Sequence, residues 1–250
     1  MKRIILCEGK TDAILISYFL ERKFGWSYTE KSIISLPVDR KNEVLNWYTH
    51  PEKPNQELAI WGTGGIDQLP VKLGSVLDRT RNERDPINRF DYIVVFFDSD
   101  QRDEGECREM VQKWATTSDL NITGDLQLGQ WIDATIDLRK RPPEAYQLRI
   151  LSIVLPPGGK GTLETFLVDA LRNSSDHDRQ LVDEARRFIG DLPDKPYLER
   201  PRCRPKACLG AILSVMSPDW VFSELHQRLT NVRWEEIESV MSTYKQLEKL

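Results

Sequence analysis

The sequence is poor in the side chains that build a structural zinc site. Its four cysteines, Cys7, Cys107, Cys203 and Cys208, form no Cys-x-x-Cys pair, and its three histidines complete no zinc-ligand spacing. These observations exclude a zinc module as the basis of the fold. A disulfide between Cys203 and Cys208 stays open, although reduced thiols in a cytoplasm are the simpler interpretation.

Long apolar runs and an excess of basic charge are also missing. No run approaches the ~18 apolar residues that a membrane-spanning helix needs. The first residues lack the apolar segment and cleavage site of a secretory signal. The net charge is −4, with 35 Lys and Arg against 39 Asp and Glu, which argues against a strongly basic nucleic-acid wrapper but leaves room for a local basic patch. We predict a cytoplasmic protein with no membrane attachment.

The first 175 residues alternate short apolar runs with amphipathic segments. Strands are predicted at residues 3–7, 32–36, 57–61, 92–97 and 147–155. Helices are predicted at residues 11–24 (with Thr11 as N-cap), 66–77, 104–114 and 162–171. Because continuous apolar runs are typical of strands covered on both faces, the pattern predicts an α/β domain over residues 1–175, with a mostly parallel sheet flanked by helices.

The pattern changes after residue 175. Residues 178–189, 205–216, 219–229 and 234–250 all have helical periodicity, and no convincing strand lies among them. We expect residues 176–250 to form a helical C-terminal extension packed on the α/β domain.

Carboxylates recur where the predicted strands end. Glu8 and Asp12 follow the first strand, Asp98 and Asp100 follow the strand at 92–97, and Glu164 lies one turn into the helix after the last strand. Because these ends share one edge of a parallel sheet, the five side chains should converge. Converging carboxylates repel one another unless a cation intervenes, and Mg²⁺ prefers such oxygen ligands. The alternative to a metal site is that Asp98 and Asp100 belong to an ordinary turn and that their carboxylates are solvated.

Two glycine-lysine segments imitate a phosphate-binding loop. For Gly9-Lys10-Thr11, the glycine that begins a Walker A loop would fall at Ile4, inside a strand. In the second segment, Lys160 is followed by Gly161 rather than by Ser or Thr. An ATPase is therefore not expected.

These residues together resemble the Toprim superfamily, whose pattern is one strand ending in Glu-Gly and a later strand ending in Asp-x-Asp. Leu6-Cys7-Glu8-Gly9 and Phe97-Asp98-Ser99-Asp100 match it. The segment from Glu8 to Asp12, the run Gly161-Thr162-Leu163-Glu164-Thr165-Phe166 and the run Arg204-Pro205-Lys206-Ala207 are most similar to the OLD-type nuclease branch. The resemblance covers residues 1–172 and, more loosely, the helices that follow. The sequence differs from topoisomerases in the three residues between Asp100 and Glu104.

The resemblance implies Mg²⁺- or Mn²⁺-dependent cleavage of phosphodiester bonds in DNA or RNA. Glu8, Asp98 and Asp100 would hold the metal ion, with Asp12 and Glu164 as candidates for a second ion. Glu8 is alternatively a general base. Lys206, also counted among the catalytic residues with Glu8, Asp98 and Asp100, would offset charge on the scissile phosphate.

The segment around Lys206 is basic. Arg200, Arg202, Arg204 and Lys206 would hold the nucleic-acid backbone, and a solvated connector is the competing interpretation. The OLD-type resemblance further suggests an ATPase on a separate chain.

Two other functions compete with that of a nuclease. A topoisomerase or primase would need a strand-passage region with a nucleophilic tyrosine, or a zinc module, and neither fits this chain. A non-catalytic binding or regulatory module of the same fold remains as the alternative, and metal binding without cleavage would favour it.

Overall fold

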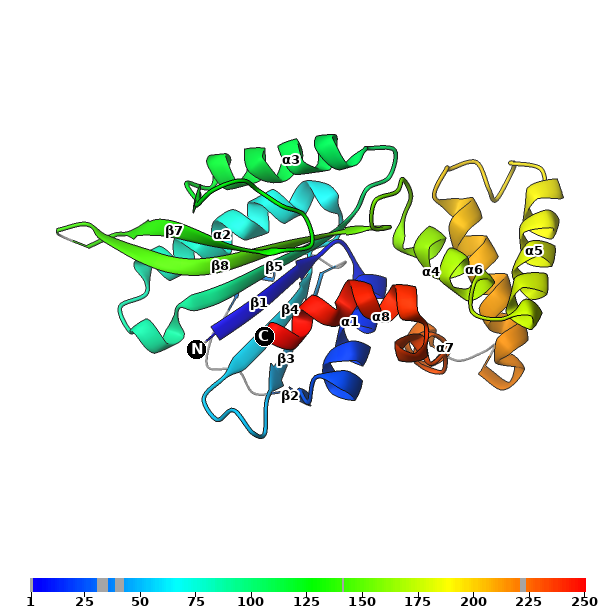
Figure 1. The fold of residues 1–250 in the computed structure, drawn as a ribbon, viewed down its shortest axis with the longest axis horizontal. Coiled ribbons are helices and arrows are strands. Elements are labelled where there is room, and N and C mark those ends of the chain that lie inside the picture. The colour runs from blue at the N-terminus through cyan, green and yellow to red at the C-terminus, as the bar shows by residue number, and fades with distance from the viewer. Residues whose placement is uncertain (1, 31–35, 39–42, 141, 221–223) are drawn as a thin grey trace.

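The computed structural model describes residues 2–30, 36–38, 43–140, 142–220 and 224–250. It has an α/β fold in which the described strands form one sheet, ordered β2-β3-β4-β1-β5-β8-β7-β6 (Figure 1). The strands are β1 (Lys2–Cys7), β2 (Ser27–Thr29), β3 (Val44–Thr49), β4 (Glu57–Gly62), β5 (Phe90–Asp98), β6 (Asn121–Ile122), β7 (Trp131–Leu138) and β8 (Glu144–Leu155).

Helices cover both faces of this sheet and extend beyond one end of it. The α-helices are α1 (Lys10–Lys23), α2 (Leu69–Asn82), α3 (Glu104–Thr117), α4 (Leu163–Arg172), α5 (Asp176–Asp191), α6 (Cys203–Met216), α7 (Leu225–Thr230) and α8 (Glu238–Tyr244). Short 3₁₀ segments lie at Ile66–Gln68, Pro86–Asn88, Pro218–Trp220, Trp234–Glu236 and Lys245–Lys249.

The α/β prediction is confirmed, but the prediction of a mostly parallel sheet is wrong. Strands β4, β1, β5 and β8 are parallel neighbours, whereas β2, β3, β6 and β7 are added at the two margins in antiparallel pairings. The margins differ because one face of an antiparallel edge strand can meet solvent. In β7 exposed and buried residues alternate, unlike the continuous burial of β1.

Two apolar cores lie on opposite faces of the central strands. On one face, Ile4 and Val95 pack against α2 and α3. On the other, Ile5 and Phe96 pack against α1 and against residues 229–250, which we call the C-terminal segment. Since successive strand side chains point to opposite faces, a parallel strand covered on both sides must be apolar throughout. This explains why β1 and β5 are easily recognised in the sequence.

The predicted helices of the α/β region match α1 to α4, with shifts of at most five residues at their ends. Strand 32–36 falls mainly outside the described residues, and Leu36 itself is not in a strand. Later in the chain, α5 and α6 are found where helices were expected, whereas residues 219–229 and 234–250 are divided among short helices and 3₁₀ segments.

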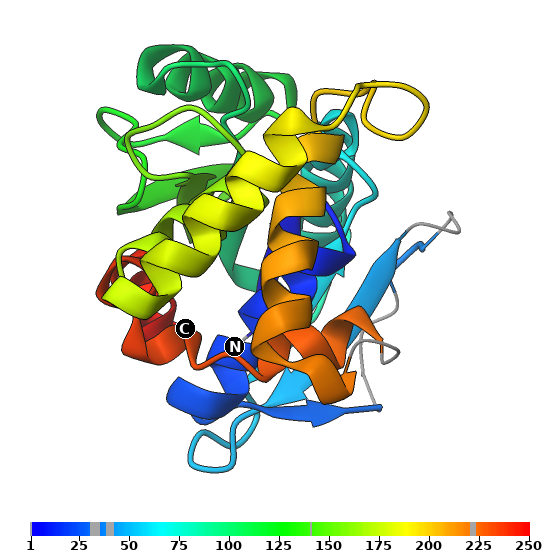
Figure 2. The ribbon, with the colours of Figure 1, turned by 90° about the vertical axis from the view of Figure 1, so that its right-hand side faces the viewer.

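Helices α4, α5 and α6 pack on one another beyond the carboxyl end of β8 (Figures 1 and 2). Within the described chain, no strand follows residue 162. The proposed division into domains at residues 175 and 176 stays a prediction, and one apolar core includes side chains from both segments.

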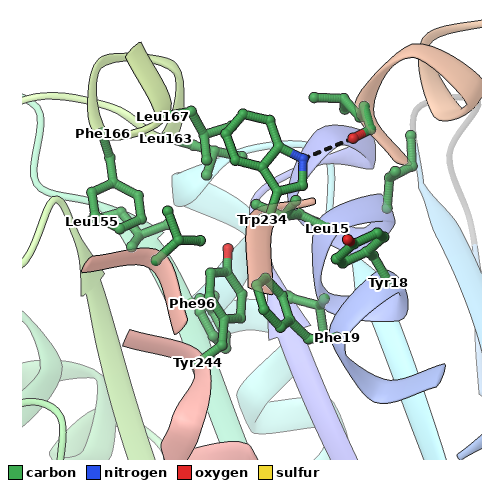
Figure 3. Close-up of a cluster of buried hydrophobic side chains, with 14 of the residues drawn as sticks. Leu15, Tyr18, Phe19, Phe96, Leu155, Leu163, Phe166, Leu167, Trp234 and Tyr244 are labelled. Atoms are coloured by element: carbon green, nitrogen blue, oxygen red, sulfur yellow. Dashed lines mark hydrogen bonds between the residues drawn. The ribbon is translucent and has the colours of Figure 1, made fainter. Parts of the chain in front are cut away.

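The C-terminal segment completes the core over α1. The Tyr244 ring stacks on Phe19, with ring centroids 4.3 Å apart, and lies 5.5 Å from Phe96 (Figure 3). Close by, the indole of Trp234 is buried and donates a hydrogen bond to the Leu229 carbonyl at 2.7 Å. Residues more than 200 positions apart in sequence therefore form one layer of the molecule.

All four cysteines lie in the described residues and are free thiols, so Cys203 and Cys208 are not bridged. Among the helices that the structure describes, none is both long enough and apolar enough to cross a bilayer.

Tyr244 gives a stability prediction. Its ring is 0% exposed, and in the described structure its hydroxyl has no hydrogen-bond partner. Because an unsatisfied buried polar group costs free energy, Tyr244→Phe should raise the free energy of unfolding by about 1 kcal/mol and the melting temperature by about 2–4 °C. Thermal unfolding, with Tyr197→Phe at an exposed position as the control, measures this. A lower melting temperature for Tyr244→Phe would mean that the hydroxyl is satisfied.

Candidate functional site

A cavity of about 600 Å³ lies where β1 and β5 end. Its walls come from the β1–α1 turn, the start of α4, the residues before and after the β3–β4 pair, and the start of α6. The lining residues are Glu8, Gly9, Lys10, Thr11, Asp12, Glu43, Val44, Gly64, Gly65, Asp98, Leu163, Glu164, Arg202 and Lys206. We call it the acidic cavity.

The turn between β1 and α1 places two of its carboxylates. Gly9 is the N-cap of α1, and its amide donates to Oδ2 of Asp12 at 3.0 Å. The predicted N-cap, Thr11, is therefore wrong, and the Asp12 side chain, in the first turn, accepts from the amide of the true N-cap. Position 62 must be glycine for this turn to fit, since a Cβ there would lie 2.8 Å from Val44 and 3.0 Å from the Gly9 carbonyl oxygen.

Asp98 connects three elements at the centre of the acidic cavity. Its backbone amide donates to Oε1 of Glu8 at 2.8 Å, which joins the ends of β5 and β1. Its own Oδ1 accepts from the Leu163 amide at 2.8 Å, in the first turn of α4. These two bonds fix Glu8 and Asp98 against each other and against the helix that carries Glu164.

Burial raises the pKa values of three carboxyl groups in the acidic cavity. It raises the pKa of Glu8 to about 7 and that of Asp12 to about 6, although backbone amides partly offset the effect in each case. The pKa of Asp98 is raised to about 9 by burial and then by the charges of Asp12 and Glu8. At neutral pH Asp98 therefore holds a proton or another cation, Glu8 is near the midpoint of its titration, and Asp12 is mostly ionised.

Basic side chains line the same cavity. Lys206, from α6, forms an ion pair with Oε1 of Glu164, whose side chain is buried while that of Lys206 is half exposed. Arg202 and Lys10 also line the cavity. The site thus brings together a cluster of buried acids and three basic side chains.

Of the predicted metal ligands, Glu8, Asp12, Asp98 and Glu164 all line the acidic cavity, whereas Asp100 does not. Asp100 has a left-handed backbone, with φ of 52°, and its amide donates to the Gly161 carbonyl at 2.7 Å. Its half-exposed carboxylate pairs with Arg102 at 3.0 Å. The role of Asp100 as a ligand stays a prediction.

The basic segment is divided in the same way. Arg202 and Lys206 line the cavity, but Arg204 donates to the Leu192 carbonyl at 2.8 Å and to Asp194 at 2.9 Å. These contacts hold the connection between α5 and α6. Arg200 is exposed and is not part of the cavity lining.

Sequence reasoning missed Glu43. Its side chain is buried, accepts from the Trp61 indole at 3.0 Å and pairs with Lys72 at 3.1 Å. It lies just before β3, an antiparallel strand, so it does not follow the carboxyl end of a parallel strand. The predicted ligands are acids that follow the ends of parallel strands, and Glu43 does not fit that pattern.

The donor chemistry of the acidic cavity suits a hard divalent cation, because its ligands are carboxylate oxygens. In the described chain, however, no group of three or more His, Cys, Asp or Glu side chains is arranged so that it could hold a metal ion. Oxygens of Glu8 and Asp98 accept backbone amides, and Glu164 is paired with Lys206. Ion binding would therefore require some of these side chains to turn.

Comparisons with known proteins give a family and one structural neighbour. A family model described as "Protein of unknown function (DUF3226)" matches residues 2–243. The fold is similar to that of the hypothetical protein PH0156 from Pyrococcus horikoshii OT3, at 17% identity and a TM-score of 0.45, over 96% of this chain and 99% of that chain. No curated protein matches. None of these findings names an activity, so function must be argued from the side chains.

The raised pKa of Asp98 predicts a pH-dependent stability. Because its pKa of about 9 in the folded chain exceeds the usual ~3.9, this carboxyl contributes most below pH ~4, and its contribution is lost as pH rises towards 9. Asp98→Asn keeps an oxygen for the Leu163 amide and cannot ionise. The variant's melting temperature should exceed that of the wild type by several degrees at pH 8.5 and by much less at pH 5.5.

The measurement is thermal unfolding at several pH values in the presence of a chelator. Asp137→Asn, at an exposed position of β7, is the matched control and should give a difference that is nearly constant with pH. A difference for Asp98→Asn that shrinks as pH rises would show that Asp98 ionises readily in the folded protein.

Proposed function

The chain belongs to the DUF3226 family of proteins of unknown function, and we propose that it is a Toprim-like protein that cleaves phosphodiester bonds of DNA or RNA with Mg²⁺ or Mn²⁺. The observation that carries the proposal is one cavity holding Glu8, Asp12 and Asp98 beside Lys10, Arg202 and Lys206. A phosphate ester bound together with a divalent cation satisfies both sets of charges.

The acids are the metal-binding side of the proposal. Glu8, Asp12 and Asp98 would hold the ion, and Glu164 and Asp100 are the further candidate ligands from the sequence pattern. When bound, the ion would supply Lewis-acid stabilisation of charge on the phosphate and a more acidic water. Because Asp98 and a part of the Glu8 population hold protons at neutral pH, ion binding would release protons and would strengthen as pH rises.

The bases are the phosphate-binding side. Lys206 and Arg202 reach the cavity from α6 and the residue that precedes it, so they can bind phosphate oxygens in the cavity that the acids also line. Binding there would draw Lys206 away from Glu164 and free that carboxylate. Arg200 and Arg204, which lie outside the cavity, would contribute only to long-range attraction of the backbone.

A non-catalytic binding or regulatory module is the second candidate. It is favoured by the Lys206–Glu164 ion pair and by the lack of a ready three-ligand group in the described residues. In either case we place the protein in the cytoplasm, and an ATPase partner would be a separate chain.

Metal binding is the first prediction of this proposal. Calorimetric titration with Mn²⁺ and Mg²⁺ at pH 8 should show binding to the wild type, and Asp98→Asn and Glu8→Gln should bind at least tenfold more weakly. Each substitution removes one charged ligand while relieving repulsion, so the variants should stay folded. Asp137→Asn is the control. If Asp98→Asn bound Mn²⁺ as the wild type does, the site would be misplaced.

Cleavage is tested separately, with single- and double-stranded DNA and RNA in Mn²⁺. Lys206→Gln should keep metal binding and lower the cleavage rate by about a hundredfold, since it removes charge stabilisation of the phosphate. Lys195→Gln, at a distant exposed position, is its control. Metal binding with no cleavage of any substrate would favour the non-catalytic module.

A further inference from the structure

A second cavity, of about 490 Å³, lies beside the acidic cavity, and we call it the hydroxyl cavity. The two share a wall at the end of β5, where Asp98 lines the acidic cavity and the next residue, Ser99, lines the hydroxyl cavity. The Ser99 hydroxyl donates to the Gly159 carbonyl at 2.9 Å and accepts from the Gly161 amide at 3.0 Å. The β8–α4 loop is thereby fastened to this wall.

The floor of the hydroxyl cavity contains an open strand edge. Strand β7 pairs with β8 only as far as Leu151, and beyond it the Ser152 carbonyl accepts from Gly129 on the same side. Because the direction of backbone groups alternates along a strand, Val154 presents its N–H and C=O on that side too. In the described chain no hydrogen bond reaches them from there, and Val154 lines the cavity.

Another part of the lining is polar and uncharged. Ser239, Ser242, Thr243 and Gln246, from the C-terminal segment, line the cavity. The hydroxyls of Ser242 and Thr243 donate to the Ser239 carbonyl at 3.0 Å and 2.9 Å. Because their hydrogens are used in this way, their oxygens can only accept hydrogen bonds from a ligand.

The charge and the volume of the hydroxyl cavity limit the chemical class of its ligand further. Among the described lining residues the one charged side chain is that of Glu104, so the lining offers nothing to neutralise a phosphate. Leu128, Ile153 and Phe166 supply apolar surface for a flat ring. The volume lies within the ~300–1,000 Å³ typical of small-molecule sites.

We infer that the hydroxyl cavity binds a nucleobase, and among the bases an amino-bearing purine. One edge of such a base pairs with the N–H and C=O of Val154, as a neighbouring strand would. Its amino group donates to the acceptor oxygens of Ser242, Thr243 or Glu104. The inference goes beyond the proposed function, because base binding does not require the acidic cavity to cleave anything.

The base can come from two sources. It can belong to a free nucleoside or nucleotide, or to a nucleic-acid strand whose phosphate occupies the acidic cavity, since the two cavities are separated by one shared wall. Adenosine as the probe represents the first source. A deoxyadenosine hexamer, with Ca²⁺ to prevent cleavage, represents the second, and a thymidine hexamer is its matched control.

The test compares the wild type with two cavity-filling variants, Thr243→Phe and Leu128→Phe, and with Thr117→Phe on the exposed face of α3 as the control. Calorimetry or fluorescence titration should show that the filling variants bind adenosine, or the deoxyadenosine hexamer, at least tenfold more weakly than the wild type and Thr117→Phe. Inosine, which has a carbonyl in place of the amino group, should bind less tightly than adenosine.

Binding of adenosine alone would assign the cavity to a free nucleoside or nucleotide, and binding only of the adenine-containing hexamer would assign it to a strand. The inference is overturned if neither probe binds, if the two hexamers bind equally while adenosine does not bind, or if both filling variants bind adenosine and the deoxyadenosine hexamer as the wild type does. Asp98→Asn should keep adenosine binding and Thr243→Phe should keep Mn²⁺ binding, so failure of the metal site and failure of the base site are distinguishable.

Discussion

The hydrogen bond from the Asp98 amide to the Glu8 carboxylate is the contact on which the acidic cavity depends. It forms because β1 and β5 are parallel neighbours that end side by side. The charge of Glu8 also raises the pKa of the Asp98 carboxyl. A backbone hydrogen bond and electrostatic repulsion therefore act on the same two residues. Helix α4 then fixes the other side of Asp98 through the Leu163 amide. The fold thus holds two carboxyl groups close together and raises the pKa of both.

The part of the fold that could be predicted from the sequence is the part with continuous burial. Strands such as β1 and β5 are apolar throughout because helices cover both their faces, and Glu8 and Asp98 follow them directly. Strand β7 was missed because its burial alternates, and its exposed aspartates and threonine obscure a short strand pattern. Strand β3 was missed as well, because most of its residues are not fully buried and it is no continuous apolar run, and Glu43 was missed with it.

The site was predictable to the same extent and no further. Strand order tells which ends lie together, so Glu8, Asp12, Asp98 and Glu164 could be grouped without coordinates. The side-chain direction of Asp100 depends on a left-handed backbone at that residue, and the anchoring of Arg204 depends on where α5 ends. Neither is encoded in local periodicity. The hydroxyl cavity results from a difference in length between β7 and β8, which only the register reveals.

The aromatic layer over α1 has a consequence for synthesis of the chain. Phe19 stacks on Tyr244, and the Lys53 ammonium donates to the carbonyl of Leu250 at 3.0 Å. During translation from the N-terminus, the sheet and α1 emerge well before the segment that covers this face. The apolar side of α1 must therefore wait uncovered while some two hundred residues are added, a condition under which nascent chains are prone to associate.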